Sequence, residues 1–94
     1  MPAVPIVSAK EVRDDGSIVE VVVWRLSQPL EPCTHLFKYR LYFGAQGVCR
    51  VRYDNERGKG DHRHRNGIEQ PYEFGSLMKL LDDFESDVNA WREP

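Results

Sequence analysis

The 94-residue chain lacks the long apolar runs, cysteine frameworks and targeting segments that mark several protein classes. No stretch approaches the roughly 20 apolar residues that cross a bilayer, so we expect no membrane association. Residues 1–8 hold two prolines but neither a basic n-region nor an apolar h-region, so we expect no signal peptide and a cytoplasmic location. Cys33 and Cys49 form no Cys-x-x-Cys motif, and we expect free thiols rather than a disulfide.

The composition, 40% hydrophobic and 30% charged, is typical of a soluble globular chain. A chain of this size builds one modest core, so residues 1–94 are expected to form a single domain. The net charge of −2 conceals an asymmetry. Residues 38–65 hold eight Lys/Arg and three acids, and residues 66–94 hold two Lys/Arg and seven acids. The middle of the chain is therefore a candidate anion-facing surface, although a charged run is often only a solvated face.

The pattern predicts an α+β fold, in which a curved antiparallel sheet of four to six strands carries one long C-terminal helix on one face. Residues 1–8 are expected to be an irregular arm because Pro2 and Pro5 lack a ladder donor. Residues 9–73 should form the sheet and its hairpins, with residues 54–60 as a loop that redirects the chain. Apolarity on both sides of Ile18–Leu26 predicts a strand covered on both faces, at least in part. Ser76 is the expected N-cap of a helix over residues 76–92.

Two segments in the middle of the chain alternate between apolar and cationic residues. Within residues 36–43 the odd positions are apolar, whereas Lys38 and Arg40 point the other way. Residues 48–53 repeat the scheme with Arg50 and Arg52. Keeping the two apolar faces together requires a connection with an odd number of residues. The sequence therefore predicts one sheet face with four clustered cations, which are equally well explained as the solvent side of a half-buried sheet.

The segment from Lys59 to Arg65 carries a carboxylate, two of the three histidines and three fixed cations. Strand alternation would place Asp61 and Arg63 on one side and His62 and His64 on the other. Asn66-Gly67 is a strong hairpin signal. A two-residue turn there sets Glu69 opposite His64 and places His62 near Pro71. Whether these histidines converge with the cationic sheet face depends on the orientation of residues 54–60, which the sequence leaves open.

One chemistry that fits these residues is phosphodiester cleavage without a metal. Histidine exchanges protons near neutral pH, and fixed cations stabilise the charge of the transition state. Glu69 would orient His64 and favour its acid role. The candidate catalytic residues are His62, His64, Asp61, Arg63 and Glu69. The candidate phosphate contacts are Lys59, Arg65, Arg50, Arg52, Lys38 and Arg40. Exposed rings of Tyr39, Tyr42 or Tyr53 would stack on bases, although burial is the more common fate of such residues.

Two other interpretations use the same residues. His62, His64 and Asp61 would supply metal ligands, but Asp61 points away from the two rings and the neighbouring cations oppose a metal ion. We therefore expect neither a metal nor another cofactor. Alternatively, the hairpin is a polar edge whose charges are solvated or paired within the domain. A non-catalytic module that binds nucleic acid or protein through this face is the alternative function.

Residues 51–88 resemble the TumE family of bacterial toxin–antitoxin proteins. The resemblance lies in Gly58-Lys59-Gly60-Asp61-His62-Arg63-His64, in Glu69-Gln70-Pro71-Tyr72 and in the run Leu80-Leu81-Asp82-Asp83-Phe84. Gln70 stands where the family pattern has glutamate. The resemblance implies a toxin that acts on RNA or translation and a helix-turn-helix antitoxin as partner. It supplies no catalytic assignment, so the roles above follow from residue chemistry.

Overall fold

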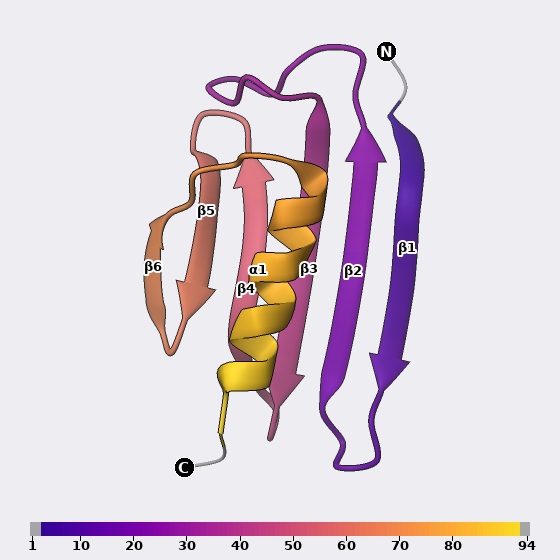
Figure 1. Cartoon of the computed structure of the whole chain (residues 1–94), viewed down its shortest axis with the longest axis vertical. Helices are drawn as coiled ribbons and strands as arrows, with labels where there is room; N and C mark the ends of the chain where they lie inside the picture. The colour runs from indigo at the N-terminus through magenta and orange to yellow at the C-terminus, as the bar shows by residue number, and fades with distance from the viewer. Residues whose placement is uncertain (1–2, 93–94) are drawn as a thin grey trace.

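In the computed structural model, which describes residues 3–92, six strands form one antiparallel sheet and a helix lies across one face (Figure 1). The strands follow one another across the sheet in chain order. The elements are β1 Val4–Val12, β2 Ile18–Arg25, β3 Phe37–Ala45, β4 Val48–Glu56, β5 Gly60–Arg65, β6 Ile68–Pro71 and α1 Leu77–Ala90. The predicted α+β architecture is confirmed. No helix within residues 3–92 is long and apolar enough to cross a membrane.

The helix α1 begins where the sequence predicts and packs through one apolar stripe. The hydroxyl of Ser76 accepts a hydrogen bond from the Lys79 backbone N–H (3.1 Å), which satisfies one of the free donors of the first turn. Leu80, Phe84 and Val88 recur at helical spacing and are buried. Each such side chain contributes about 1.5–3 kcal/mol relative to an exposed one. The core that they join consists of Val23, Tyr39, Leu41, Phe43, Ala45, Val51 and Tyr53.

The two faces of the sheet have different characters. The helix face, which faces α1, contains the cross-strand row Leu41–Tyr53–Arg63. The open face, on the other side, contains the rows Arg40–Asp54–His62 and Tyr42–Arg52–His64. Because successive strand residues point to opposite faces, apolar residues of β3 and β4 collect under the helix and polar residues collect on the open face.

The connection between β3 and β4 differs from the expectation. Gln46 and Gly47 form a two-residue turn, both with positive φ (57° and 73°) as a tight hairpin requires. The parity of the two strands is restored by a register shift between Phe43 and Gly44 of β3. One extra residue in β4 has the same effect on the alternation as an odd loop. The predicted face assignment holds for Arg52, but the predicted odd loop was wrong.

Two further expectations about the strands were wrong, and one was confirmed. Residues 4–8 belong to β1 and not to an irregular arm, because β1 is an edge strand and its ladder shifts between Pro5 and Val7. Of the rest of the predicted arm, Ala3 is exposed and precedes the strand, and residues 1–2 lie outside the described part. The partial cover expected for both faces of β2 is confirmed, because every residue from Ile18 to Trp24 is at least half-buried; only Val23 is fully buried, since α1 lies over β3 and β4 (Figure 1). Residues 54–60 are mostly strand, because β4 runs to Glu56 and β5 resumes at Gly60 after a tight turn.

Replacement of Leu80 by alanine is expected to lower the free energy of unfolding by about 2–5 kcal/mol, since it leaves a cavity between α1 and the sheet. Urea unfolding measures the change. The matched control is Met78→Ala on the same helix, because Met78 is 74% exposed and its truncation should cost little. Equal losses in the two variants would contradict the packing described here.

Candidate functional site

The register of β4 against β5 brings His62 and His64, the two histidines of the Lys59–Arg65 segment, to the open face. Arg52 lies opposite His64 and Asp54 lies opposite His62 in the ladder. The His62 and His64 ring centroids are 6.5 Å apart. The histidines therefore do converge with part of the predicted cationic face, through Arg52.

His62 is buried, and both of its ring nitrogens face acceptors. Nε2 lies 2.6 Å from Oδ1 of Asp54, and Nδ1 lies 3.2 Å from the backbone carbonyl oxygen of Gly60. The Gly60 carbonyl oxygen accepts a hydrogen bond from Nδ1, whereas the contact between Nε2 and Asp54 is close but lacks hydrogen-bond geometry. The arrangement buries the His62 ring between the backbone of Gly60 and the carboxylate of Asp54, beneath the open face.

His64 is more accessible, with 27% of its side chain exposed. Its Nε2 contacts Oε2 of Glu69 across the β5–β6 hairpin, at short range, and lies 3.3 Å from Nη2 of Arg52. The sequence-predicted pairing of His64 with Glu69 is confirmed. The hydrogen bond from His64, with the charge of Lys59, lowers the pKa of Glu69. Within residues 3–92, Nδ1 of His64 has no hydrogen-bond partner.

Arg52 links the two imidazole–carboxylate pairs. Its Nε lies 3.4 Å from Oδ2 of Asp54, and its Nη2 approaches His64. Lys59 joins this cluster, because its Nζ lies 3.7 Å from Oε1 of Glu69. We call the cluster the histidine group; its members are Arg52, Asp54, Lys59, His62, His64 and Glu69. A pocket of about 160 Å³ opens beside the group and is lined by Lys59, Asp61, His62, Glu69, Gln70 and Pro71.

Asp61 points to the helix face and supports the fold there. Its Oδ1 accepts from the Tyr39 hydroxyl (2.6 Å) and contacts Nε2 of His35 (2.8 Å). Nδ1 of His35 accepts from the backbone N–H of Phe37, so the proton of a neutral ring lies on Nε2. The His35 ring stacks on Phe74 at 3.7 Å between centroids. Asp61 thus anchors the loop before β3 to β5.

Arg63 is also held on the helix face. Its Nη1 donates to the Tyr53 hydroxyl (3.0 Å) and lies 3.6 Å from Oδ2 of Asp87. The Gln70 amide oxygen, in the orientation that satisfies the amide, accepts from Nη2 (2.9 Å) and Nε (3.1 Å). With these contacts, Arg63 connects β5, β6 and α1. Of the five residues expected to be catalytic, the structure gathers His62, His64 and Glu69, and separates Asp61 and Arg63 from them.

The predicted phosphate contacts are divided between the faces. Lys38 lies on the open face and donates to the backbone oxygen of Asn55, and Arg40 pairs with Glu20. Arg65 lies on the helix face. The bulge turns Arg50 toward Trp91, with the guanidinium carbon 5.2 Å from the ring centroid. The four-cation cluster predicted for one face therefore loses Arg50.

The tyrosines proposed as stacking platforms differ in access. Tyr39 and Tyr53 are fully buried on the helix face. Tyr42 is half-buried on the open face, and Arg40 lies over its ring at 5.3 Å. Of these three, only Tyr42 presents a ring near the histidine group.

Two sets of potential metal ligands occur within residues 3–92. They are Cys33, His35 and Asp61, and Asp54, Glu56 and His62. In each set the imidazole already contacts a carboxylate of the same set. The set considered from the sequence, His62, His64 and Asp61, is not brought together, because Asp61 lies on the opposite face. Both cysteines are free thiols as expected, and burial raises the pKa of each.

Sequence reasoning missed Asp54 and His35. Asp54 continues the alternation of Arg50 and Arg52, and extending that parity by one step identifies it as an open-face residue. His35 lies in a loop 26 positions from its partner Asp61. No periodicity connects the two residues, so its role emerges only from the tertiary structure.

Replacement of Asp54 by asparagine is expected to lower the free energy of unfolding by about 1–3 kcal/mol, because it removes the carboxylate that contacts both the buried His62 ring and Arg52. Chemical denaturation at neutral pH measures the loss. Asp82→Asn, an exposed acid on α1, is the matched control and should change stability by less than about 0.5 kcal/mol. A loss no larger than the control's would show that the pair is not held as described.

Tyr53 provides a pH-dependent prediction. Burial, and then the hydrogen bond to Asp87, raise its pKa to about 12, against about 10 in an unfolded chain. The resulting stabilisation is complete below pH about 10 and is lost as the pH rises toward 12. Tyr53→Phe should therefore show a shallower alkaline loss of stability, measured by denaturation at stepped pH. An unchanged slope would contradict the assignment.

Comparison with known proteins gives one match. A family model described as Toxin TumE matches residues 3–92, nearly the whole chain. No curated protein and no solved structure matches the chain.

Proposed function

The chain belongs to the TumE toxin family, and from that premise we propose that it cleaves RNA by metal-independent proton transfer at His64. Membership makes the chain the toxin of a toxin–antitoxin system and gives it an antitoxin partner. A helix-turn-helix antitoxin, RNA as the substrate and the cytoplasm as the location are part of the proposal. The rest of the proposal concerns the histidine group on the open face.

The observation that carries the proposal is the contact between His64 and Glu69. In this scheme Glu69 accepts a hydrogen bond from Nε2–H of the neutral ring, so the 3.3 Å approach of Arg52 Nη2 to Nε2 is a contact and not a hydrogen bond. The lone pair then lies on Nδ1, which has no partner within the described residues. A carboxylate that orients one ring nitrogen while the other nitrogen exchanges a proton is a recurrent arrangement in acid–base catalysis. His64 is the general base in this scheme.

The reaction that fits is attack of a ribose 2′-hydroxyl on the adjacent phosphate. Nδ1 of His64 takes the hydroxyl proton while the 2′-oxygen bonds to phosphorus. The bond to the 5′-oxygen breaks, and that oxygen takes a proton from water. The hydroxide left behind takes the proton from Nδ1, which returns His64 to its starting state. The products are a 2′,3′-cyclic phosphate and a 5′-hydroxyl end. No metal or redox partner enters this balance.

The cations around His64 supply the electrostatic part. Arg52 and Lys59 flank the Glu69–His64 pair, and the buried His62 ring lies beside it. Fixed positive charge stabilises the extra negative charge that develops on the phosphate in the transition state. Lys38 and Arg40 continue the open face beyond Arg52 and are the proposed contacts to neighbouring phosphates.

His64→Gln is expected to reduce RNA cleavage by a factor of about 100 or more, because a general base contributes about 10²–10⁴-fold. Glu69→Gln should also reduce it, with a smaller effect. The matched control Glu73→Gln removes an exposed carboxylate after β6 and should leave cleavage unchanged. The assay follows cleavage of single-stranded RNA by purified protein, and cyclic phosphate ends identify the reaction.

Two outcomes would reject this mechanism. If a chelator abolishes cleavage, metal chemistry replaces proton transfer by His64, and Asp54, Glu56 and His62 become the candidate ligands. If the His64 variant still inhibits growth while Arg52→Gln does not, the chain acts by binding and not by catalysis.

A further inference from the structure

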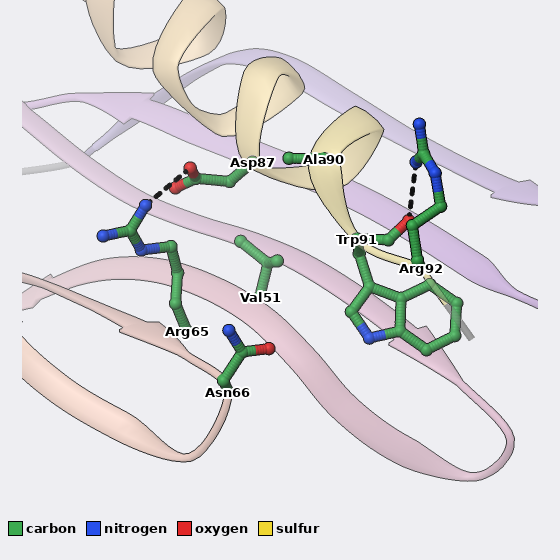
Figure 2. A pocket seen from close by; sticks show the side chains of 7 residues that line it. All are labelled: Val51, Arg65, Asn66, Asp87, Ala90, Trp91 and Arg92. Atoms are coloured by element: carbon green, nitrogen blue, oxygen red, sulfur yellow. Dashed lines mark hydrogen bonds and ion pairs between the residues drawn. The ribbon is translucent and has the colours of Figure 1, made fainter. Parts of the chain in front are cut away.

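A second site lies on the helix face, at the end of the sheet that carries the Asn66-Gly67 turn. The end of α1 and the β5–β6 hairpin enclose a pocket of about 280 Å³. Figure 2 shows the lining, which consists of Val51, Arg65, Asn66, Asp87, Ala90, Trp91 and Arg92. The volume is near the lower end of the range for ligand sites, which suits one small planar group and not a large ligand.

The pocket is cationic. Arg65 and Arg92 line it, and Arg50 lies over the Trp91 ring. The one acid of its lining is Asp87, whose oxygens contact Tyr53, Arg63 and Arg65. Among the described residues Arg65 has a single ion pair, from Nη1 to Asp87 at 3.2 Å. Its remaining guanidinium N–H groups are therefore available to an anion.

Trp91 supplies the aromatic surface. It directly follows α1 and is half-buried, with its ring packed edge-on against Phe43 at 5.7 Å between centroids. Figure 2 shows the indole along one wall of the pocket, with the side chains of Arg65 and Asn66 on the other side. A flat ring beside unsatisfied guanidinium groups is the combination by which proteins hold single-stranded nucleic acid without reading its sequence.

The position of the pocket connects it to His64. Arg65 is the next residue of β5, and strand alternation sends its side chain to the face opposite that of His64. The two residues lie at the hairpin end, so a single strand passing round the Asn66-Gly67 turn reaches both faces. We propose that this pocket binds one nucleotide unit of single-stranded RNA, with the base on Trp91 and a phosphate on Arg65. This inference rests on the proposed RNA substrate.

The first experiment measures the fluorescence of Trp91. Trp24 is the other tryptophan and lies near the end of β2 that is remote from the pocket, so Trp24→Phe leaves Trp91 as the reporter. A 2′-O-methylated hexauridylate binds but offers no attacking hydroxyl. It is expected to quench the Trp91 fluorescence saturably. Inorganic phosphate and uridine monophosphate serve as smaller probes, and the monophosphate should quench more strongly.

The second experiment measures affinity by fluorescence anisotropy of the labelled oligonucleotide. Trp91→Ala and Arg65→Gln are each expected to weaken binding about 5-fold or more. Arg65→Gln should also reduce the slope of log affinity against log salt by about 0.7, the value for one phosphate contact with a single strand. Arg57→Gln, an exposed arginine at the opposite end of β5, is the matched control and should change neither quantity. Thermal unfolding of each variant shows that it remains folded.

The outcomes separate this site from the catalytic proposal. Unchanged affinity in both pocket variants, without Trp91 quenching, overturns the pocket and leaves cleavage at His64 standing. Quenching that persists in a cleavage-defective His64→Gln variant supports the pocket as an independent site. Quenching by inorganic phosphate equal to that by the oligonucleotide overturns the base contact. If no RNA binds to any variant, both the proposed nucleotide pocket and the proposed RNA substrate are rejected.

Discussion

The register between β4 and β5 is the constraint on which both the core and the site depend. It sets His64 beside Arg52 and His62 beside Asp54, and sends Asp61 and Arg63 under α1. A slip of one residue would expose the helix-face partners and bury the open-face ones. Both faces resist that slip, because His62 would lose its carboxylate and Arg63 would lose Tyr53. The same ladder therefore defines the fold and assembles the histidine group.

Alternation in β5 divides one dense sequence segment into two kinds of residue. Asp61 and Arg63 hold the helix face together through buried phenol and imidazole groups. His62 is an intermediate case, since its contacts resemble those of a structural ion pair although it lies behind the open face. His64 alone combines an orienting carboxylate with an unpartnered nitrogen among the described residues. The density that singles out residues 59–65 in the sequence thus reflects two roles.

Local signals predicted much of this arrangement. Asn66-Gly67 gave the hairpin register and thereby the pairing of His64 with Glu69, and the apolar stripe after Ser76 gave the helix. Features that depend on tertiary structure were not predictable. The bulge that turns Arg50 toward Trp91 leaves no mark in the hydrophobic pattern, since an odd loop satisfies the same parity. Asp54 lies in a polar stretch that resembles a loop, and becomes a strand residue because β5 pairs with it.

Many of the charges behind the asymmetry of the chain pair with one another within the domain. Arg63 and Arg65 of the basic segment meet Asp87 of the acidic one between sheet and helix. On the open face Arg40 pairs with Glu20 and Lys59 with Glu69, and these four side chains are between 35% and 54% exposed. Exposed pairs of this kind are worth about 0–1 kcal/mol, so a phosphate can displace the carboxylate at little cost. The number of Lys and Arg side chains is therefore a poor guide to phosphate binding. The side chains available to a phosphate are those whose ion pairs within the domain are weak.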